Sequence, residues 1–122
     1  MDKTIIFWGK VIKGKQRGKS FGFPTANTKL HKNIAHGIYI SRARVSQKNY
    51  PSLTFIGSAK TFGENDVKTE TYFIGSRPNL YGKWLSVTLI KKIRGNKKFK
   101  SQEDLISQMK KDLQIAKKYF KI

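Results

Sequence analysis

The sequence predicts a mainly β protein, a closed antiparallel barrel of five or six strands with one helix packed across it. Two observations lead to this fold. Most of the chain consists of strand-like segments separated by turn-forming residues, and the C-terminal segment alone has helical periodicity. Strands of this length, punctuated by turns, favour closure into a barrel. The 122 residues are expected to form a single domain, 1–122.

The predicted strands are rich in β-branched and aromatic residues. They are expected at 4–13, within 37–50, at 53–59, at 67–74 and at 83–94. Turns or loops are expected at 14–22, 46–49, 63–66 and 75–79, where glycine, asparagine, serine and charged residues gather. The segment from Phe23 to His36 is expected to be irregular, and Pro24 disfavours helix for the residue before it.

The C-terminal helix is expected from about Gln102 to Tyr119. Ser101 can cap its N-terminus, and Glu103 and Asp104 suit its first turn. Its apolar residues recur every three to four positions: Leu105, Ile106, Met109, Leu113, Ala116 and Phe120.

The composition excludes several classes of protein. The chain has no cysteine, which excludes a disulfide scaffold, a zinc knuckle and thiol chemistry. No apolar stretch approaches the ~20 residues that span a bilayer, so no membrane association is expected. The N-terminus does not resemble a signal peptide, and we expect a soluble cytoplasmic protein, a monomer.

The net charge of +19, from 26 Lys and Arg against 7 Asp and Glu, attracts polyanions. Nucleic acid, phosphorylated metabolites and an anionic membrane surface are therefore candidate partners of such a charge. The lysines are spread along the whole chain, however, and a solvated surface without a partner explains them equally well. A nucleic-acid-binding barrel is thus an alternative that the dispersed lysines do not favour.

The basic, glycine-rich loop at 14–22 is the first candidate site. Only three residues separate Gly14 from Gly18, where a phosphate-binding P-loop needs four, and Phe-Gly-Phe-Pro follows Ser20 instead of a helix. Its glycines and its cations, Lys19 among them, still suit close contact with phosphate, and a basic loop without a ligand is the alternative.

Thr25 and Asn27 form the second candidate. Two residues apart in an extended chain, their side chains point to the same side. Their neutral oxygens suit Mg²⁺ that takes its negative ligands from nucleotide phosphates, although both residues are also common in turns.

Elimination identifies Glu70 as a candidate general base. It is the one carboxylate expected in the middle of a strand, where its side chain points either into the barrel mouth or to solvent. An exposed strand glutamate is the alternative. Arg94, Lys97 and Phe99 cluster before the helix and suit a planar ligand or its phosphate, or closure of the core.

Together these residues resemble the riboflavin kinase (flavokinase) family in its bacterial form. The resemblance runs from about Gly9 to Phe120, and its most specific part is the segment at 14–27, which ends in Pro-Thr-Ala-Asn. Further matches follow in order: Gly37-Ile38-Tyr39, Ile56-Gly57, Thr61-Phe62, Thr69-Glu70, Leu80-Tyr81-Gly82, Ile93-Arg94, Lys97-Lys98-Phe99, Leu105-Ile106, Gln108 and Asp112.

The resemblance implies a six-stranded Greek-key barrel that transfers the γ-phosphoryl group of ATP to the ribityl 5′-hydroxyl of riboflavin, giving FMN and ADP. It implies that Thr25 and Asn27 hold Mg²⁺, or another divalent cation, and the phosphates, and that Glu70 is the base. The remaining implied contacts are Gly14, Lys19, Phe73 and Tyr81 with the nucleotide, and Arg94, Lys97 and Phe99 with the flavin.

The sequence departs from the family pattern at four positions: Lys60, Tyr72, Asn79 and Asn96. These departures concern flavin affinity and loop closure, and they suggest a second alternative, a flavin-binding relative with little kinase activity. Many bacterial relatives carry an additional FAD synthetase (adenylyltransferase) domain. Nothing in these residues resembles one, so FAD synthesis is not expected.

Overall fold

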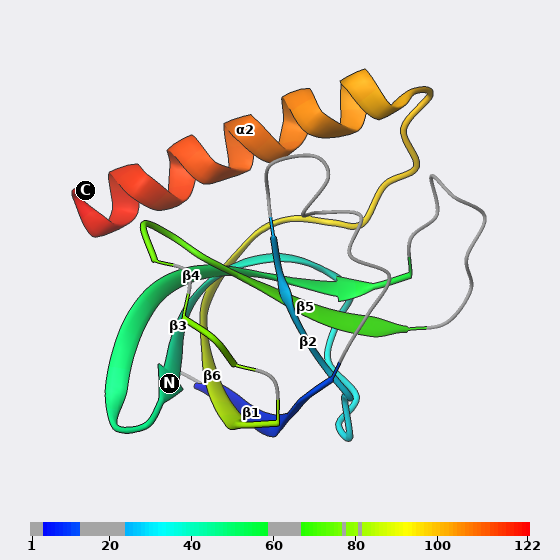
Figure 1. Cartoon of the computed structure of the whole chain (residues 1–122). Helices are drawn as coiled ribbons and strands as arrows, with labels where there is room; N and C mark the ends of the chain where they lie inside the picture. The colour runs from blue at the N-terminus through cyan, green and yellow to red at the C-terminus, as the bar shows by residue number, and fades with distance from the viewer. Residues whose placement is uncertain (1–3, 13–23, 59–66, 77, 81) are drawn as a thin grey trace.

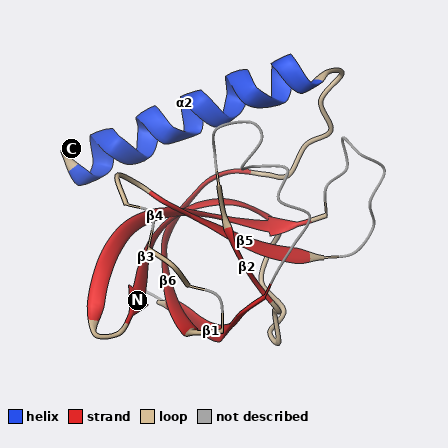
Figure 2. Ribbon diagram, viewed as in Figure 1, coloured by secondary structure: helices blue, strands red, loops and turns tan. Residues whose placement is uncertain are grey.

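The computed structural model describes residues 4–12, 24–58, 67–76, 78–80 and 82–122. These residues form six antiparallel strands closed into a barrel and a C-terminal helix, which lies across one end of it (Figures 1 and 2). The elements are β1 (Ile5–Ile12), β2 (Ala26–Thr28), β3 (Gly37–Val45), β4 (Lys48–Gly57), β5 (Lys68–Phe73), β6 (Trp84–Arg94) and α2 (Gln102–Phe120).

The strands follow the order β1-β2-β5-β4-β3-β6 around the barrel. Strands β3, β4 and β5 pair in succession, and β2, which precedes them, lies beside β5. This non-sequential neighbour makes the topology a Greek key. The six-stranded antiparallel barrel with a C-terminal helix is therefore confirmed.

The inner faces of the strands fill the barrel with alternate side chains. One apolar cluster includes Phe7, Val11, Val87 and Leu89. Beside it runs a ladder of buried hydroxyl groups that crosses three strands. The Ser41 Oγ lies 2.7 Å from the Ser52 Oγ and 2.8 Å from the Thr54 Oγ1, which lies 3.3 Å from the Thr71 Oγ1.

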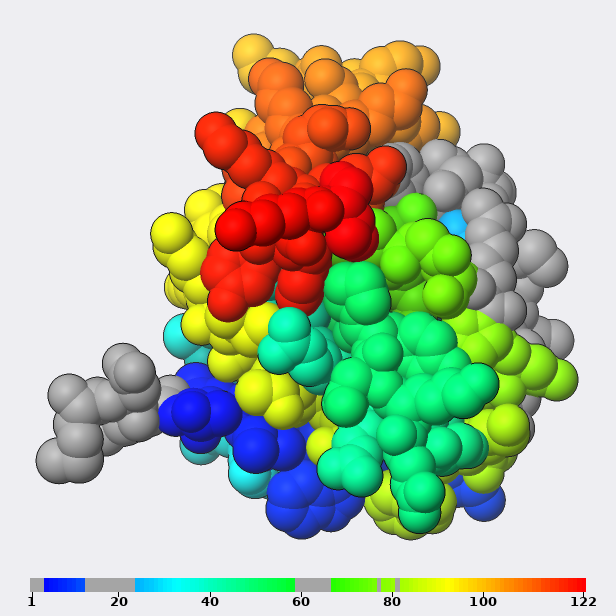
Figure 3. Space-filling view, turned by 90° about the vertical axis from the view of Figure 1, so that its left-hand side faces the viewer, coloured from blue at the N-terminus to red at the C-terminus, as the bar shows by residue number. Residues whose placement is uncertain are grey.

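A second apolar cluster joins the outer face of the barrel to α2. Ala116 of the helix is fully buried against Ile38, Ile40 and Leu53. Figure 3 shows α2 above the β3–β4 hairpin on this side of the molecule. The predicted cap is confirmed, since the Ser101 Oγ accepts a hydrogen bond from the Asp104 backbone N–H at 3.2 Å. The helix ends one residue beyond its predicted end.

Two predicted boundaries were wrong. The four-residue turn predicted at 46–49 is a two-residue turn in which Ser46 and Gln47 adopt left-handed conformations, with φ of 49° and 68°. Strand β4 begins directly after it, five residues before the predicted start of the strand at 53–59. The segment expected to be irregular up to His36 contains the short strand β2. The predicted loop at 14–22 and turn at 63–66 lie outside the described residues.

Candidate active site

The residues predicted to hold a metal and to act as a base lie on two adjacent strands. Asn27 of β2 is directly opposite Glu70 of β5 in the antiparallel register. Side chains of such directly paired residues share a face, with Cβ atoms roughly 5 Å apart. Thr25 precedes β2 by one residue, and its side chain is partly buried like those of Asn27 and Glu70. The structure therefore brings the three predicted residues into one neighbourhood.

This neighbourhood lies on the outer face of the barrel wall. Thr69, Thr71 and Phe73 alternate with Glu70 and are buried in the interior, so Glu70 points outward. Its other direct neighbour is Phe55 of β4, which packs partly buried against the cluster beneath α2. Glu70 is thus neither in the barrel mouth nor fully in solvent. Its side chain is half-buried on the outer wall beside the apolar surface that α2 covers.

The segment that follows β6 reaches the same wall. The side-chain amide of Asn96 donates a hydrogen bond to the Ser58 carbonyl at 3.1 Å and lies against Gly57 at the end of β4. A Cβ atom at Gly57, whose φ is 149°, would stand 2.8 Å from the Asn96 Nδ2. Glycine is therefore required for this close approach. Gly57 lies two residues beyond Phe55 on β4, and Phe55 is the direct partner of Glu70. The contact therefore brings the segment after β6 to the part of β4 that neighbours Glu70.

The three residues predicted to bind the flavin lie together, Arg94 at the end of β6 and Lys97 and Phe99 in the segment that follows it. The Phe99 ring is buried, with the Arg94 guanidinium 5.7 Å and the Lys97 Nζ 5.2 Å from its centroid. An aromatic ring beside two cations suits a planar ligand or its phosphate. This grouping agrees with the predicted cluster.

Arg94 is anchored by a residue to which the sequence assigned no role. Asp112 of α2 is 2% exposed and accepts three hydrogen bonds from Arg94, two from Nε at 2.9 and 3.1 Å and one from Nη2 at 2.8 Å. Gln108 donates a further bond to Asp112 at 3.0 Å. Asp112 therefore holds the Arg94 guanidinium in place beside Phe99. The signal that could have revealed this anchor is the position of Asp112 on the apolar stripe of the helix, between Met109 and Ala116. A carboxylate on a buried face is expected to have a cationic partner.

Phe73 is a predicted nucleotide contact that does not lie on this wall. Phe73 lies on the opposite face of β5 from Glu70, buried with its ring 5.3 Å from that of Tyr50, and its contact with nucleotide stays a prediction. Gly14, Lys19 and Tyr81 lie outside the described residues.

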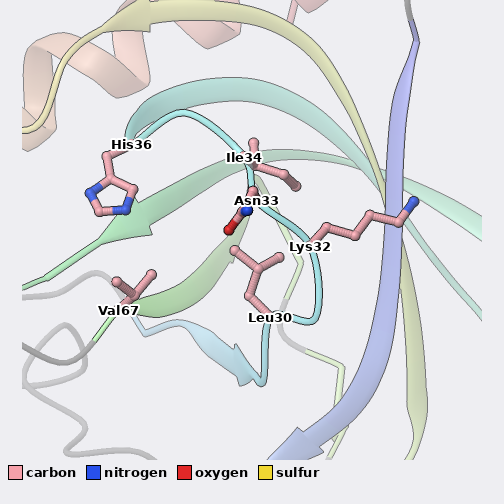
Figure 4. Close-up of a pocket in the computed structure, with 6 residues that line it drawn as sticks. All are labelled: Leu30, Lys32, Asn33, Ile34, His36 and Val67. Carbon is pink, nitrogen blue, oxygen red and sulfur yellow. The ribbon is translucent and has the colours of Figure 1, made fainter.

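A pocket of about 190 Å³ lies elsewhere, between the β2–β3 connection and Val67 (Figure 4). It contains none of the predicted site residues. Its lysine, Lys32, extends away from the pocket and donates a hydrogen bond to the Ile6 carbonyl at 2.6 Å. The lining residues are Leu30, Lys32, Asn33, Ile34, His36 and Val67.

The fold defines a class of protein, the small six-stranded antiparallel barrels with a C-terminal helix. Residues 1–120 match the riboflavin kinase (flavokinase) family, and the chain belongs to it. No helix among the described residues is long and apolar enough to cross a membrane.

Several known proteins resemble the chain in sequence or in fold. The chain is 37% identical to the RNA-binding riboflavin kinase RibR of Bacillus subtilis over 98% of its length, and it spans about half (52%) of that relative. The crystal structure of a macrolide-efflux protein from Streptococcus pneumoniae has a TM-score of 0.80 and 27% identity, over 92% of this chain and 38% of that one. The structure of riboflavin kinase from Trypanosoma brucei has a TM-score of 0.70 and 23% identity, over 97% of this chain and 78% of that one.

Proposed function

We propose that the chain is a riboflavin kinase that transfers the γ-phosphoryl group of ATP to the 5′-hydroxyl of riboflavin. The observation that carries this proposal is the direct pairing of Asn27 with Glu70 on the outer wall, in a chain that belongs to the family. This pairing sets a neutral oxygen donor beside a carboxylate, and the Phe99 cluster is anchored at the same wall by Asn96.

The donor set fits a divalent cation shared with a nucleotide. Thr25 and Asn27 offer a hydroxyl and an amide oxygen, which are neutral. Among the described residues, no group of three or more histidines, cysteines or carboxylates could hold a metal without help. Mg²⁺ at Thr25 and Asn27 would therefore take its negative ligands from ATP phosphates, and it would neutralise charge on the transferred group.

Glu70 is the base in this proposal. Its carboxylate accepts the proton of the ribityl 5′-hydroxyl as that oxygen forms its bond to the γ-phosphorus. The bond between the γ-phosphorus and the bridging oxygen breaks, and its electron pair leaves with ADP. Glu70 is half-buried and lies directly opposite Phe55, so apolar surface borders the proposed base on one side.

The cluster of Arg94, Lys97 and Phe99 is proposed to hold the flavin, with Arg94 set by Asp112. Gly14, Lys19, Phe73 and Tyr81 are proposed to contact the nucleotide, as the family resemblance implies.

The test is incubation with riboflavin, ATP and Mg²⁺, followed by chromatographic separation of the flavins. Wild-type protein is expected to produce FMN. Glu70→Gln is expected to lower kcat by roughly 100-fold or more, the usual contribution of a general base, while riboflavin affinity changes little. Glu103→Gln makes the same chemical change on an exposed residue of the first turn of α2 and is the matched control.

Two results would contradict the proposal. Equal turnover by Glu70→Gln and wild type would remove Glu70 from the base function. Tight binding of FMN without FMN production by wild-type protein would replace the kinase with a flavin-binding module.

A further inference from the structure

The outer faces of β1, β6 and β3 form an exposed surface on which aromatic and cationic side chains gather. We call it the tryptophan–arginine face and define it by Trp8, Lys10, Trp84, Arg42 and Arg44. Trp8 is 59% exposed and Trp84 is 64% exposed. Figure 3 shows parts of β1 (blue), β6 (yellow) and the β3–β4 hairpin (teal to green) side by side beneath α2. The fold brings Lys10, Arg42 and Arg44, which are far apart in the sequence, close to the two indoles.

The strand register fixes the order of side chains across this face. Trp8 is opposite Ser86, and Ser86 is opposite Arg44 on its other side. Lys10 is opposite Trp84 in the next row. Because Trp84 lies two residues from Ser86, the two indoles are diagonal neighbours on adjacent strands.

Between Trp84 and Ile90, the middle strand β6 stands lower than its neighbours. Ser86 and Thr88 carry short hydroxyl side chains, with Trp8 on the β1 side and Arg42 and Arg44 on the β3 side. A chain laid along β6 would therefore meet aromatic surface on one side and guanidinium groups on the other. Lys32 adds a further cation, with its Nζ 5.2 Å from the centroid of Trp8.

We propose that the tryptophan–arginine face binds single-stranded nucleic acid, with bases stacked on Trp8 and Trp84 and phosphates held by the arginines and Lys10. Base stacking on aromatic side chains within a positively charged track is how proteins bind single strands without sequence readout. The net charge of +19 provides the long-range attraction that a polyanion requires.

The arrangement favours a single strand over a duplex or a membrane. A duplex keeps its bases stacked inside, so exposed indoles gain nothing from it. A lipid surface would favour an apolar centre with cations around it, whereas here Lys10 is directly opposite Trp84 and the cations lie between and beside the rings.

The face is separate from the proposed kinase site. In the closed order β1-β2-β5-β4-β3-β6, strand β6 lies across the barrel from β5, which carries Glu70. Binding at one site can therefore be measured without blocking the other.

The tryptophans themselves provide the assay. The chain contains two, Trp8 and Trp84, and both lie on this face. Titration with a mixed-sequence 12-nucleotide RNA, without flavin, is expected to quench most of the tryptophan emission. Trp8→Ala and Trp84→Ala should each weaken binding of fluorescein-labelled RNA by roughly 5- to 150-fold, the range measured for loss of one stacked base.

Charge variants distinguish RNA binding at this face from non-specific attraction of RNA to the net positive charge of the protein. Arg42→Gln with Arg44→Gln is expected to flatten the slope of log K against log salt concentration by about 1.4, because each phosphate contact on a single strand contributes about 0.7. Lys110→Gln with Lys111→Gln removes the same charge from the exposed side of α2 and should leave the slope unchanged.

Three outcomes would overturn the proposal. The first is RNA binding that leaves tryptophan emission unchanged, which places the strand elsewhere. The second is duplex RNA bound as tightly as the single strand. The third is tighter binding to phosphatidylserine vesicles than to RNA, accompanied by a blue shift of the emission, which identifies a membrane surface.

Discussion

Removal of the Asp112 carboxylate tests the anchor between β6 and α2. Asp112→Ala leaves the Arg94 guanidinium without three hydrogen bonds and leaves the Gln108 amide without its acceptor. Breaking a buried ion pair by removing one partner typically costs about 3–5 kcal/mol. The Arg94 side chain is 19% exposed, so it can turn partly toward water, and we expect a loss of about 2–4 kcal/mol.

Urea unfolding followed by circular dichroism measures this loss. For a chain of this size, about 3 kcal/mol corresponds to a fall of roughly 10 °C in Tm. A double-mutant cycle with Arg94→Ala isolates the interaction between the two side chains, and we expect a coupling free energy of about 1.5–3 kcal/mol. Glu103→Ala, which removes an exposed carboxylate from the same helix, is the control and should cost less than about 1 kcal/mol.

Additive effects of the two single substitutions would refute the reasoning, because they would show that the ion pair contributes no free energy beyond the separate side chains. So would a loss below about 1 kcal/mol for Asp112→Ala.

Substitutions at three further positions test the fold. Gly37→Ala places a Cβ atom 2.5 Å from the backbone carbonyl oxygen of Arg94, and it is expected to cost about 2 kcal/mol or more in unfolding free energy; a neutral result would show that the strands separate easily there. Ser101→Ala removes the cap of α2 and should cost about 1 kcal/mol, whereas Ser101→Asp should nearly preserve stability. Burial raises the pKa of Tyr39 above 10.0, which favours its neutral form in the folded state. The contribution of Tyr39 to stability is therefore complete below pH 10 and declines as pH rises through the raised pKa. The difference in unfolding free energy between wild type and Tyr39→Phe, measured in urea, should shrink above pH 10. A difference in unfolding free energy that stays constant from pH 8 to 11 would contradict this.

The sequence was most informative where one strong local signal decided the structure. The cap at Ser101 and the apolar spacing through Ala116 predicted α2 to within one residue. The start of β4 was missed because its first half is polar and contains Pro51, which is rare inside strands. The three residues of β2 are too few to show periodicity, and their pairing with β1 and β5 decides their conformation.

The candidate site shows a different limit. Alternation along β5 predicted that Glu70 and Thr71 face opposite ways, but the sequence could not say which face is interior. The interior here holds hydroxyl groups from Thr69 and Thr71, a polar choice that hydrophobicity does not predict. The anchor of Arg94 joins residues 18 positions apart, and only packing of α2 on the barrel reveals it.

The hydroxyl ladder inside the barrel has a consequence for how this interior can change. Each hydroxyl in the row from Ser52 through Ser41 and Thr54 to Thr71 depends on its neighbour for a bond. Replacing one hydroxyl residue by valine or alanine leaves the neighbouring buried hydroxyl without its hydrogen-bond partner. Converting a whole bonded set to apolar groups of equal shape removes donors and acceptors together. Simultaneous substitution of these hydroxyl residues should therefore cost less stability than substitution of one of them alone.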